Sequence, residues 1–131
     1  MSDSLDAVIR SVGLPIRQET LDLAWTLTEE APASAQMTIL VTLVARPGMA
    51  PKLEQAAVEF VQSTATLSGA LGSTLHRSIT DPLMFILVER FASRDAFERH
   101  MSSDYFRRFQ VVQAPLLAGP AEAVLLERAN P

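Results

Sequence analysis

The sequence contains no cysteine, which excludes disulfides, thiolate metal sites and a cysteine nucleophile, and which is compatible with a reducing compartment. It also lacks a long hydrophobic run, because the longest mostly apolar stretch, residues 37–45, is far too short to span a bilayer. The N-terminus carries Asp3 and Asp6 and has neither the basic start nor the apolar core of a secretory signal. We therefore expect a cytoplasmic protein that does not contact membranes.

Positive charge is scarce at the start of the chain. The formal net charge of −4 arises wholly in residues 1–36, which hold six acids and two bases, whereas residues 37–131 hold nine of each. Proteins that bind nucleic acid usually carry a basic patch or stripe. This sequence has none, so nucleic acid is not an expected partner.

The length and the hydrophobic content are those of one folded unit. A chain of 131 residues with 48% hydrophobic residues can bury a substantial core within one domain. The pattern divides it into an N-terminal helical arm with a linker, residues 1–36, and a domain, residues 37–131. The arm is too short to fold alone. We expect it to pack on its own domain, on a second subunit, over a pocket through Trp25, or on a protein partner.

From residue 37 the hydrophobic pattern alternates between strand and helix periods. The expected strands cover residues 37–46, 71–79, 83–91 and 121–128. One expected helix starts near Pro51, and a second follows Ser93, is broken at Ser102 and Ser103, and ends at Pro115. The order is β-α-β-β-α-β, which predicts an α+β, ferredoxin-like fold with an antiparallel sheet.

Two helices on one face of a four-stranded sheet leave its other face uncovered. The first strand, MTILVTLVAR in residues 37–46, is apolar enough to favour cover on both faces. A homodimer that packs sheet against sheet would supply this cover, and two-fold dimers are the commonest oligomers.

An ordered set of residues carries a resemblance to a known family. Pro47-Gly48 follows the first strand, and the later matches extend from Leu75-His76-Arg77-Ser78 through residues 80–91 to Ser93, Ala96-Phe97, His100, Ser103-Asp104 and Phe106. Over residues 37–128 the chain resembles the antibiotic biosynthesis monooxygenase domain. The resemblance implies a dimeric α+β barrel with a pocket between sheet and helices in each subunit. It leaves the activity open, because some members are quinol or polyketide monooxygenases that use oxygen without metal or flavin, and others isomerise or cleave small metabolites or degrade haem.

The chain also departs from that family. The family usually has a tryptophan where this sequence has Phe91, and its haem-degrading branch adds an asparagine and a histidine where we place Val41 and Gln110. Without the imidazole there is no evident axial ligand for haem iron. We therefore expect no cofactor.

Three side chains are candidates for catalysis: His100, Glu89 and His76. Glu89 shares a strand face with aromatic residues, where desolvation favours a carboxyl group that acts as a base near neutral pH; the alternative is an ion pair, for instance with Arg77. His100 lies one turn after Phe97 and is either an acid or base or a histidine favoured at a helix end. His76 is either a polar anchor or a histidine at a dimer interface.

The aromatic residues predict a pocket for a flat ligand, although each of them also suits a core. The expected substrate-binding residues are Phe60, Phe85, Phe91, Tyr105, Phe106 and Phe109. Two histidines far apart among scattered acids do not predict a metal site.

Two hypotheses follow. The first is an enzyme, a cofactor-independent monooxygenase acting on a small aromatic, quinol or polyketide-like substrate, or a related small-metabolite isomerase. The second is a non-catalytic binding or accessory module whose arm docks a partner.

Overall fold

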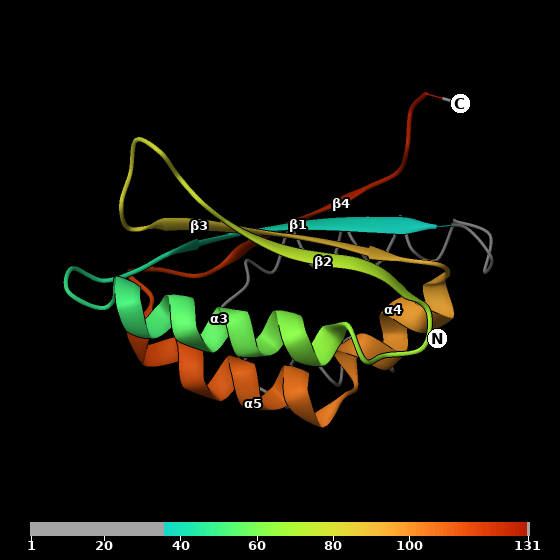
Figure 1. Cartoon of the computed structure of the whole chain (residues 1–131), viewed down its shortest axis with the longest axis horizontal. Helices are drawn as coiled ribbons and strands as arrows, with labels where there is room; N and C mark the ends of the chain where they lie inside the picture. The colour runs from blue at the N-terminus through green and yellow to red at the C-terminus, as the bar shows by residue number, and fades with distance from the viewer. Residues whose placement is uncertain (1–35, 131) are drawn as a thin grey trace.

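The computed structural model describes residues 36–130; the predicted N-terminal arm therefore lies outside the described residues. Figure 1 shows a four-stranded sheet with its helices gathered on one face. The strands are β1 (Met37–Val44), β2 (Ala70–Arg77), β3 (Met84–Phe91) and β4 (Glu122–Leu126). The helices are α3 (Ala50–Thr64), α4 (Arg94–Met101) and α5 (Asp104–Gln113), followed by the short 3-10 helix η1 (Ala114–Leu116).

The topology confirms the ferredoxin-like prediction. The strand order is β2-β3-β1-β4 and all neighbouring strands are antiparallel. Residues 93–113 form two helices, so the full order is β-α-β-β-α-α-β. No helix in residues 36–130 is long and apolar enough to cross a membrane.

Most element ends lie within two residues of their predicted positions. The second strand, expected to extend to Ile79, ends at Arg77. Beyond it, the Ser78 hydroxyl accepts a hydrogen bond from the backbone of Asp81, whose carboxylate accepts one from the backbone of Leu83. These side-chain bonds form the turn that a strand pattern does not reveal.

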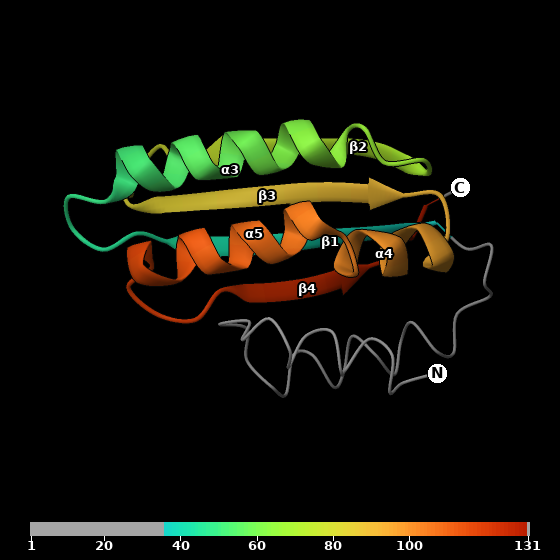
Figure 2. The same ribbon diagram turned by 90° about the horizontal axis from the view of Figure 1, so that it is seen from below.

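The core lies between the sheet and the helices. Figure 2, viewed from the helical side, shows α3 along β2 and β3 and α5 along β1. Strand alternation directs Leu43, Phe85, Leu87 and Phe91 inward, and each is at most 1% exposed. The same alternation gives β3 a face of four buried residues, and one of the four is charged: Glu89.

The connection from α3 to β2 is tight. Gly69 has φ of +90°, a conformation that side chains rarely adopt, and a Cβ there would lie 2.7 Å from the Cβ of Ala96 in α4. The next residues form a β-bulge, because Ala70 pairs with Phe91 and Gly72 with Arg90. Leu71 is thus the extra residue of the bulge, and it is 42% exposed instead of continuing the predicted inward alternation.

Two serines end one helix and start the next, as the sequence predicts. Ser93 caps α4 by accepting a hydrogen bond from the backbone of Ala96, and Ser103 caps α5 by accepting one from Phe106. The break between the helices spans only Ser102 and Ser103. It places the last turn of α4 beside the first turn of α5.

Candidate functional site

Two ionisable side chains meet in the core between sheet and helices. Glu89 of β3 is 1% exposed and His100 of α4 is 2% exposed. Nε2 of His100 lies 3.5 Å from Oε1 of Glu89, a distance suited to an ion pair and longer than a strong hydrogen bond. A buried carboxylate and a buried imidazole each need a polar partner, and here each has the other.

Each member of the pair has a second polar partner. The hydroxyl of Ser73 donates to Oε2 of Glu89 at 3.0 Å, and Ser73 is the residue directly opposite Glu89 in the β2–β3 ladder. Nδ1 of His100 lies 2.6 Å from the hydroxyl of Tyr105. Since Nε2 faces a carboxylate, the arrangement favours a proton on Nε2 and a Tyr105 hydroxyl that donates to Nδ1.

Four residues therefore form a continuous polar chain, Ser73–Glu89–His100–Tyr105, which we call the polar chain. It runs from β2 through β3 and α4 to the first turn of α5. The helix break at Ser102 and Ser103 makes this geometry possible, because it changes the direction of the polypeptide backbone between His100 and Tyr105. In an unbroken helix two residues five apart would not share a face.

Aromatic rings enclose the imidazole. The ring centroid of His100 lies 4.8 Å from that of Phe91, 5.3 Å from that of Phe106 and 5.4 Å from that of Phe60. These rings keep water away, which strengthens electrostatic interactions within the polar chain.

Tyr105 is the half-buried member of the chain. Its burial raises the pKa of its hydroxyl above the ordinary value of 10.0, and the charge of Glu89 raises it further, while hydrogen bonds with the side chains of Thr64 and Ser103 act in the opposite direction. Near neutral pH the phenol is therefore protonated and can donate to His100.

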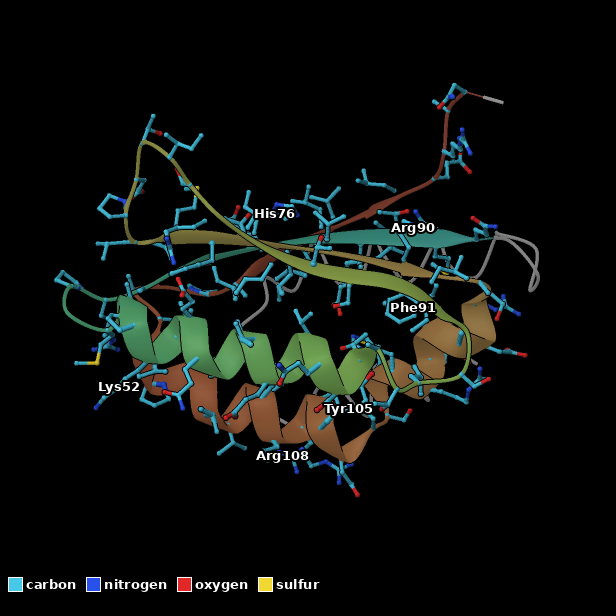
Figure 3. All side chains as sticks on the ribbon, in the orientation of Figure 1. Lys52, His76, Arg90, Phe91, Tyr105 and Arg108 are labelled. Atoms are coloured by element: carbon cyan, nitrogen blue, oxygen red, sulfur yellow. The ribbon has the colours of Figure 1, made fainter. Side chains whose placement is uncertain are left out.

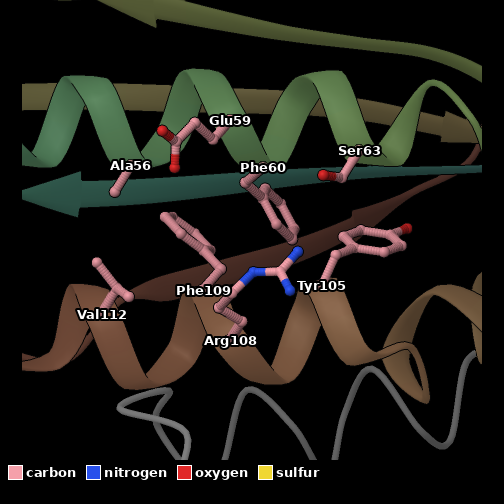
Figure 4. Close-up of a pocket in the computed structure, with 8 residues that line it drawn as sticks. All are labelled: Ala56, Glu59, Phe60, Ser63, Tyr105, Arg108, Phe109 and Val112. Atoms are coloured by element: carbon pink, nitrogen blue, oxygen red, sulfur yellow. The ribbon is translucent and has the colours of Figure 1, made fainter.

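A groove of about 100 Å³ lies next to Tyr105. It runs between α3 and α5, and Figure 4 shows its walls. Its lining residues are Ala56, Glu59, Phe60, Ser63, Tyr105, Arg108, Phe109 and Val112. The Tyr105 ring lines the groove, whereas its hydroxyl is turned toward His100. Neither Glu89 nor His100 lines the groove, so Tyr105 is the one member of the polar chain that does.

The structure divides the predicted substrate-binding aromatics into two groups. Phe60, Tyr105 and Phe109 line the groove, and the rings of Phe60 and Phe109 stack with centroids 4.4 Å apart. Phe85, Phe91 and Phe106 do not line it and are at most 4% exposed in the core.

His76 is separated from the other two catalytic candidates. It is exposed on the outer face of the sheet, where its Nε2 lies 2.9 Å from the hydroxyl of Thr74. Figure 3 shows His76 and Arg90 on the face opposite to Phe91 and Tyr105. The ion pair of Glu89 with Arg77, considered from the sequence, is wrong: Arg77 pairs with Glu54 of α3, and Glu89 pairs with His100.

The sequence-based reading missed Ser73 as a partner of Glu89, and it placed Tyr105 only among the aromatic walls. The signal for Ser73 was its position on the same strand face as Leu75. Within residues 36–130 no three His, Asp or Glu side chains gather as metal ligands would. Chemically, the polar chain can carry a proton between the groove and the core.

The fold and the site together define an α+β ferredoxin-like domain with a carboxylate–imidazole–phenol chain in its core. The family model described as antibiotic biosynthesis monooxygenase matches residues 37–112. The chain therefore belongs to the antibiotic biosynthesis monooxygenase family.

Solved structures support the same assignment. A Pseudomonas aeruginosa protein, PA3566, is 28% identical, with a TM-score of 0.69 over 76% of this chain and 100% of its own. A candidate antibiotic biosynthesis monooxygenase from Caulobacter crescentus is 25% identical, with a TM-score of 0.69 over 75% of this chain and 93% of its own. Rv0793 from Mycobacterium tuberculosis, at 21% identity and a TM-score of 0.70 over 74% of this chain and 98% of its own, shares the fold. No curated protein matches the sequence.

Proposed function

We propose that this protein is a cofactor-independent monooxygenase that takes a proton from a small aromatic substrate and lets the resulting anion react with oxygen. The observation that carries the proposal is the polar chain, which connects a buried carboxylate and imidazole to a phenol beside a groove. Membership of the antibiotic biosynthesis monooxygenase family supports it.

The proton would move in one relay. The Tyr105 hydroxyl, which is turned toward His100, takes a proton from a substrate that reaches past the Tyr105 ring, while that hydroxyl passes its own proton to Nδ1 of His100. The imidazolium formed is stabilised by the carboxylate of Glu89, which lies 3.5 Å away and is held by Ser73. Tyr105 thus stays a neutral phenol, as its raised pKa favours.

The substrate itself, once deprotonated, reacts with oxygen. The deprotonated substrate attacks O2 through a carbon that still bears a hydrogen, and the product is a hydroperoxide. Loss of that hydrogen as a proton, with cleavage of the O–O bond, leaves a carbonyl on the carbon and releases the second oxygen atom as water. The protein supplies a base and a site from which water is excluded. The Phe60, Phe91 and Phe106 rings around His100 fit that role.

Oxygen uptake by the purified, metal-stripped protein tests the proposal, with quinols, anthrones and single-ring phenols as substrates. Tyr105→Phe keeps the ring and removes the proton path, so we expect uptake to fall by about 10²-fold or more, the usual contribution of a positioned acid or base. Glu89→Gln should also lower it. His76→Ala is the matched control, because His76 lies on the opposite sheet face, and its uptake should equal that of the wild type.

A second candidate function is a non-catalytic binding module, and a specific observation favours it. Glu89 and His100 are at most 2% exposed, and both already have protein partners. Such a pair can serve the fold alone. If a broad panel gives no uptake while the protein is folded, a binding module or an isomerase explains the structure better. Uptake that is unchanged in Tyr105→Phe would instead keep the oxygenase and reject the relay through Tyr105.

We also infer that two copies associate through the outer face of the sheet. Val124 and Leu126 of β4 are 50% and 43% exposed on this face, beside the partly buried Leu40 of β1 and Val88 of β3. An apolar sheet face of this kind is usually covered by a second layer. A second copy would meet it with an identical surface.

A further inference from the structure

Two charged residues flank the α3–α5 groove on opposite sides. Arg108 extends across it from α5, and Glu59 stands on the α3 wall (Figure 4). Within residues 36–130 neither side chain makes a hydrogen bond or an ion pair, although several nearby charges do, such as Arg107 with Asp104. A cation and an anion thus face the same groove with their bonding capacity unused by the described chain.

We propose that this groove binds a single-ring aromatic carboxylic acid that carries a hydroxyl or amino group. The inference rests on the proposed function, since it names the substrate class for the same site. The inference does not follow from the fold alone, because it depends on two particular side chains, those of Arg108 and Glu59.

The charges determine the functional groups of the ligand. A planar guanidinium suits a carboxylate, because it can donate two parallel hydrogen bonds to the two oxygens. A carboxylate such as that of Glu59 repels an anion but accepts a hydrogen bond from a hydroxyl or an amino group. A ligand with an acid at one end and a donor at the other satisfies both residues at once.

The walls and the size of the groove determine the rest of the ligand. Ala56, Phe60, Phe109 and Val112 present apolar surface between the two charges, which suits an aromatic ring. The volume is about 100 Å³, and a cavity of roughly 150 Å³ holds benzene. The groove is thus smaller than a cavity that encloses one benzene ring, but Glu59, Arg108 and Val112 are exposed and leave it open to solvent. A single ring can therefore lie partly in it with its substituents at the mouth, whereas the three fused rings of an anthrone would extend far beyond it.

The position of Tyr105 links this ligand to the polar chain. Its ring forms the end of the groove nearest α4, and its hydroxyl contacts His100. An aromatic acid bound between Arg108 and Glu59 therefore lies beside the one residue through which a proton can reach the core.

The test is calorimetric titration of the full chain with 4-hydroxybenzoate and 4-aminobenzoate. Benzoate lacks the donor and 4-hydroxybenzamide lacks the negative charge, so they serve as comparison ligands. For a ligand of this size in an open groove we expect dissociation constants in the millimolar to sub-millimolar range. Both comparison ligands should bind more weakly than 4-hydroxybenzoate.

Matched variants locate the binding. Arg108→Gln should weaken 4-hydroxybenzoate about tenfold or more, since it removes charged hydrogen bonds. Arg107→Gln, one position earlier, exposed and paired with Asp104, should leave the affinity unchanged. Glu59→Gln should reduce the advantage of 4-hydroxybenzoate over benzoate.

The outcomes separate this inference from the proposed function. Saturable binding that Arg108→Gln lowers and Arg107→Gln does not supports the inference, even if the bound acid causes no oxygen uptake. The absence of saturable binding, or equal loss in both variants, overturns it. If quinols or anthrones are oxidised while aromatic acids do not bind, the proposed function stands and the groove is not its substrate site.

Discussion

Tyr105 is the only tyrosine in the chain, and it joins the surface groove to the buried pair of Glu89 and His100. Its spectroscopic signal is therefore free of other phenols. This makes the outer end of the polar chain directly observable in the native protein.

We predict that Tyr105 ionises above pH 10 in the folded protein and near pH 10 after unfolding. Burial raises the folded pKa, so the folded state holds the proton more tightly. The stability that this group contributes is complete below the unfolded pKa and is lost as the pH rises through that value toward the folded one. Near-ultraviolet absorbance measured with and without urea gives both midpoints, and a lower midpoint in the folded protein would contradict the assignment.

We predict that His100→Leu lowers the free energy of unfolding by about 3–5 kcal/mol, because it leaves a buried carboxylate without its partner. Glu89→Leu should lower it by about 1–3 kcal/mol, because it leaves the buried Nε2–H of a neutral imidazole unpaired. The double variant should cost less than the sum of the two. Urea unfolding of the four proteins gives the coupling energy. As a control, Glu54→Ala breaks the exposed pair with Arg77 and should cost at most about 1 kcal/mol.

The sequence predicts part of this site for physical reasons. Alternation along β3 places Glu89 on the aromatic face, and the buried pair confirms that placement. The partner of Glu89 could not be found in the same way, because it depends on the register between strands. That register sets Ser73 opposite Glu89 and directs Arg77 to Glu54.

At the scale of elements, local sequence signals predict where helices start better than they predict where strands end. Pro51 marks the first turn of α3, and Ser93 and Ser103 cap α4 and α5 where the sequence predicts them. Strand ends depend on side-chain bonds in turns, such as those of Ser78, and on the bulge at Leu71. Neither the turn bonds nor the bulge leaves a periodic pattern in the sequence.

We predict that Gly69→Ala lowers the free energy of unfolding by about 1–3 kcal/mol, the cost of a strained backbone conformation, and that its contact with Ala96 adds to this. Gly72→Ala is the control, because a Cβ at that position meets nothing within 4 Å. Thermal or urea unfolding of the two variants measures the difference. Equal stability would mean that the turn can relax away from α4.

At the scale of the whole molecule, the sheet has one face covered by α3, α4 and α5 and another that no described element covers (Figure 1). His76 lies on the second face with Thr74. Association through this face would bury that imidazole, so its role is structural in the arrangement we propose.

We predict that Val124→Glu combined with Leu126→Glu converts a dimer into a monomer, because it brings like charges together at a two-fold interface. Val111→Glu is the matched control, since Val111 is 65% exposed on α5 at the other side of the molecule. Light scattering after gel filtration measures the mass. A monomeric wild-type protein, or a doubly substituted dimer, would contradict the proposed interface.

The β-bulge at Leu71 has a consequence for how this chain tolerates the loss of a residue. Deletion of Leu71 would make Ala70 and Gly72 consecutive, so that they pair regularly with Phe91 and Arg90 while the turn at Gly69 keeps its place beside Ala96. Deletion of Thr74 would instead make Ser73 and Leu75 consecutive, so that one of these two inward side chains turns to the outer face; if it is Ser73, Glu89 loses its hydroxyl partner. The loss of one residue is therefore tolerable before Gly72, at the bulge, and damaging to the polar chain after it.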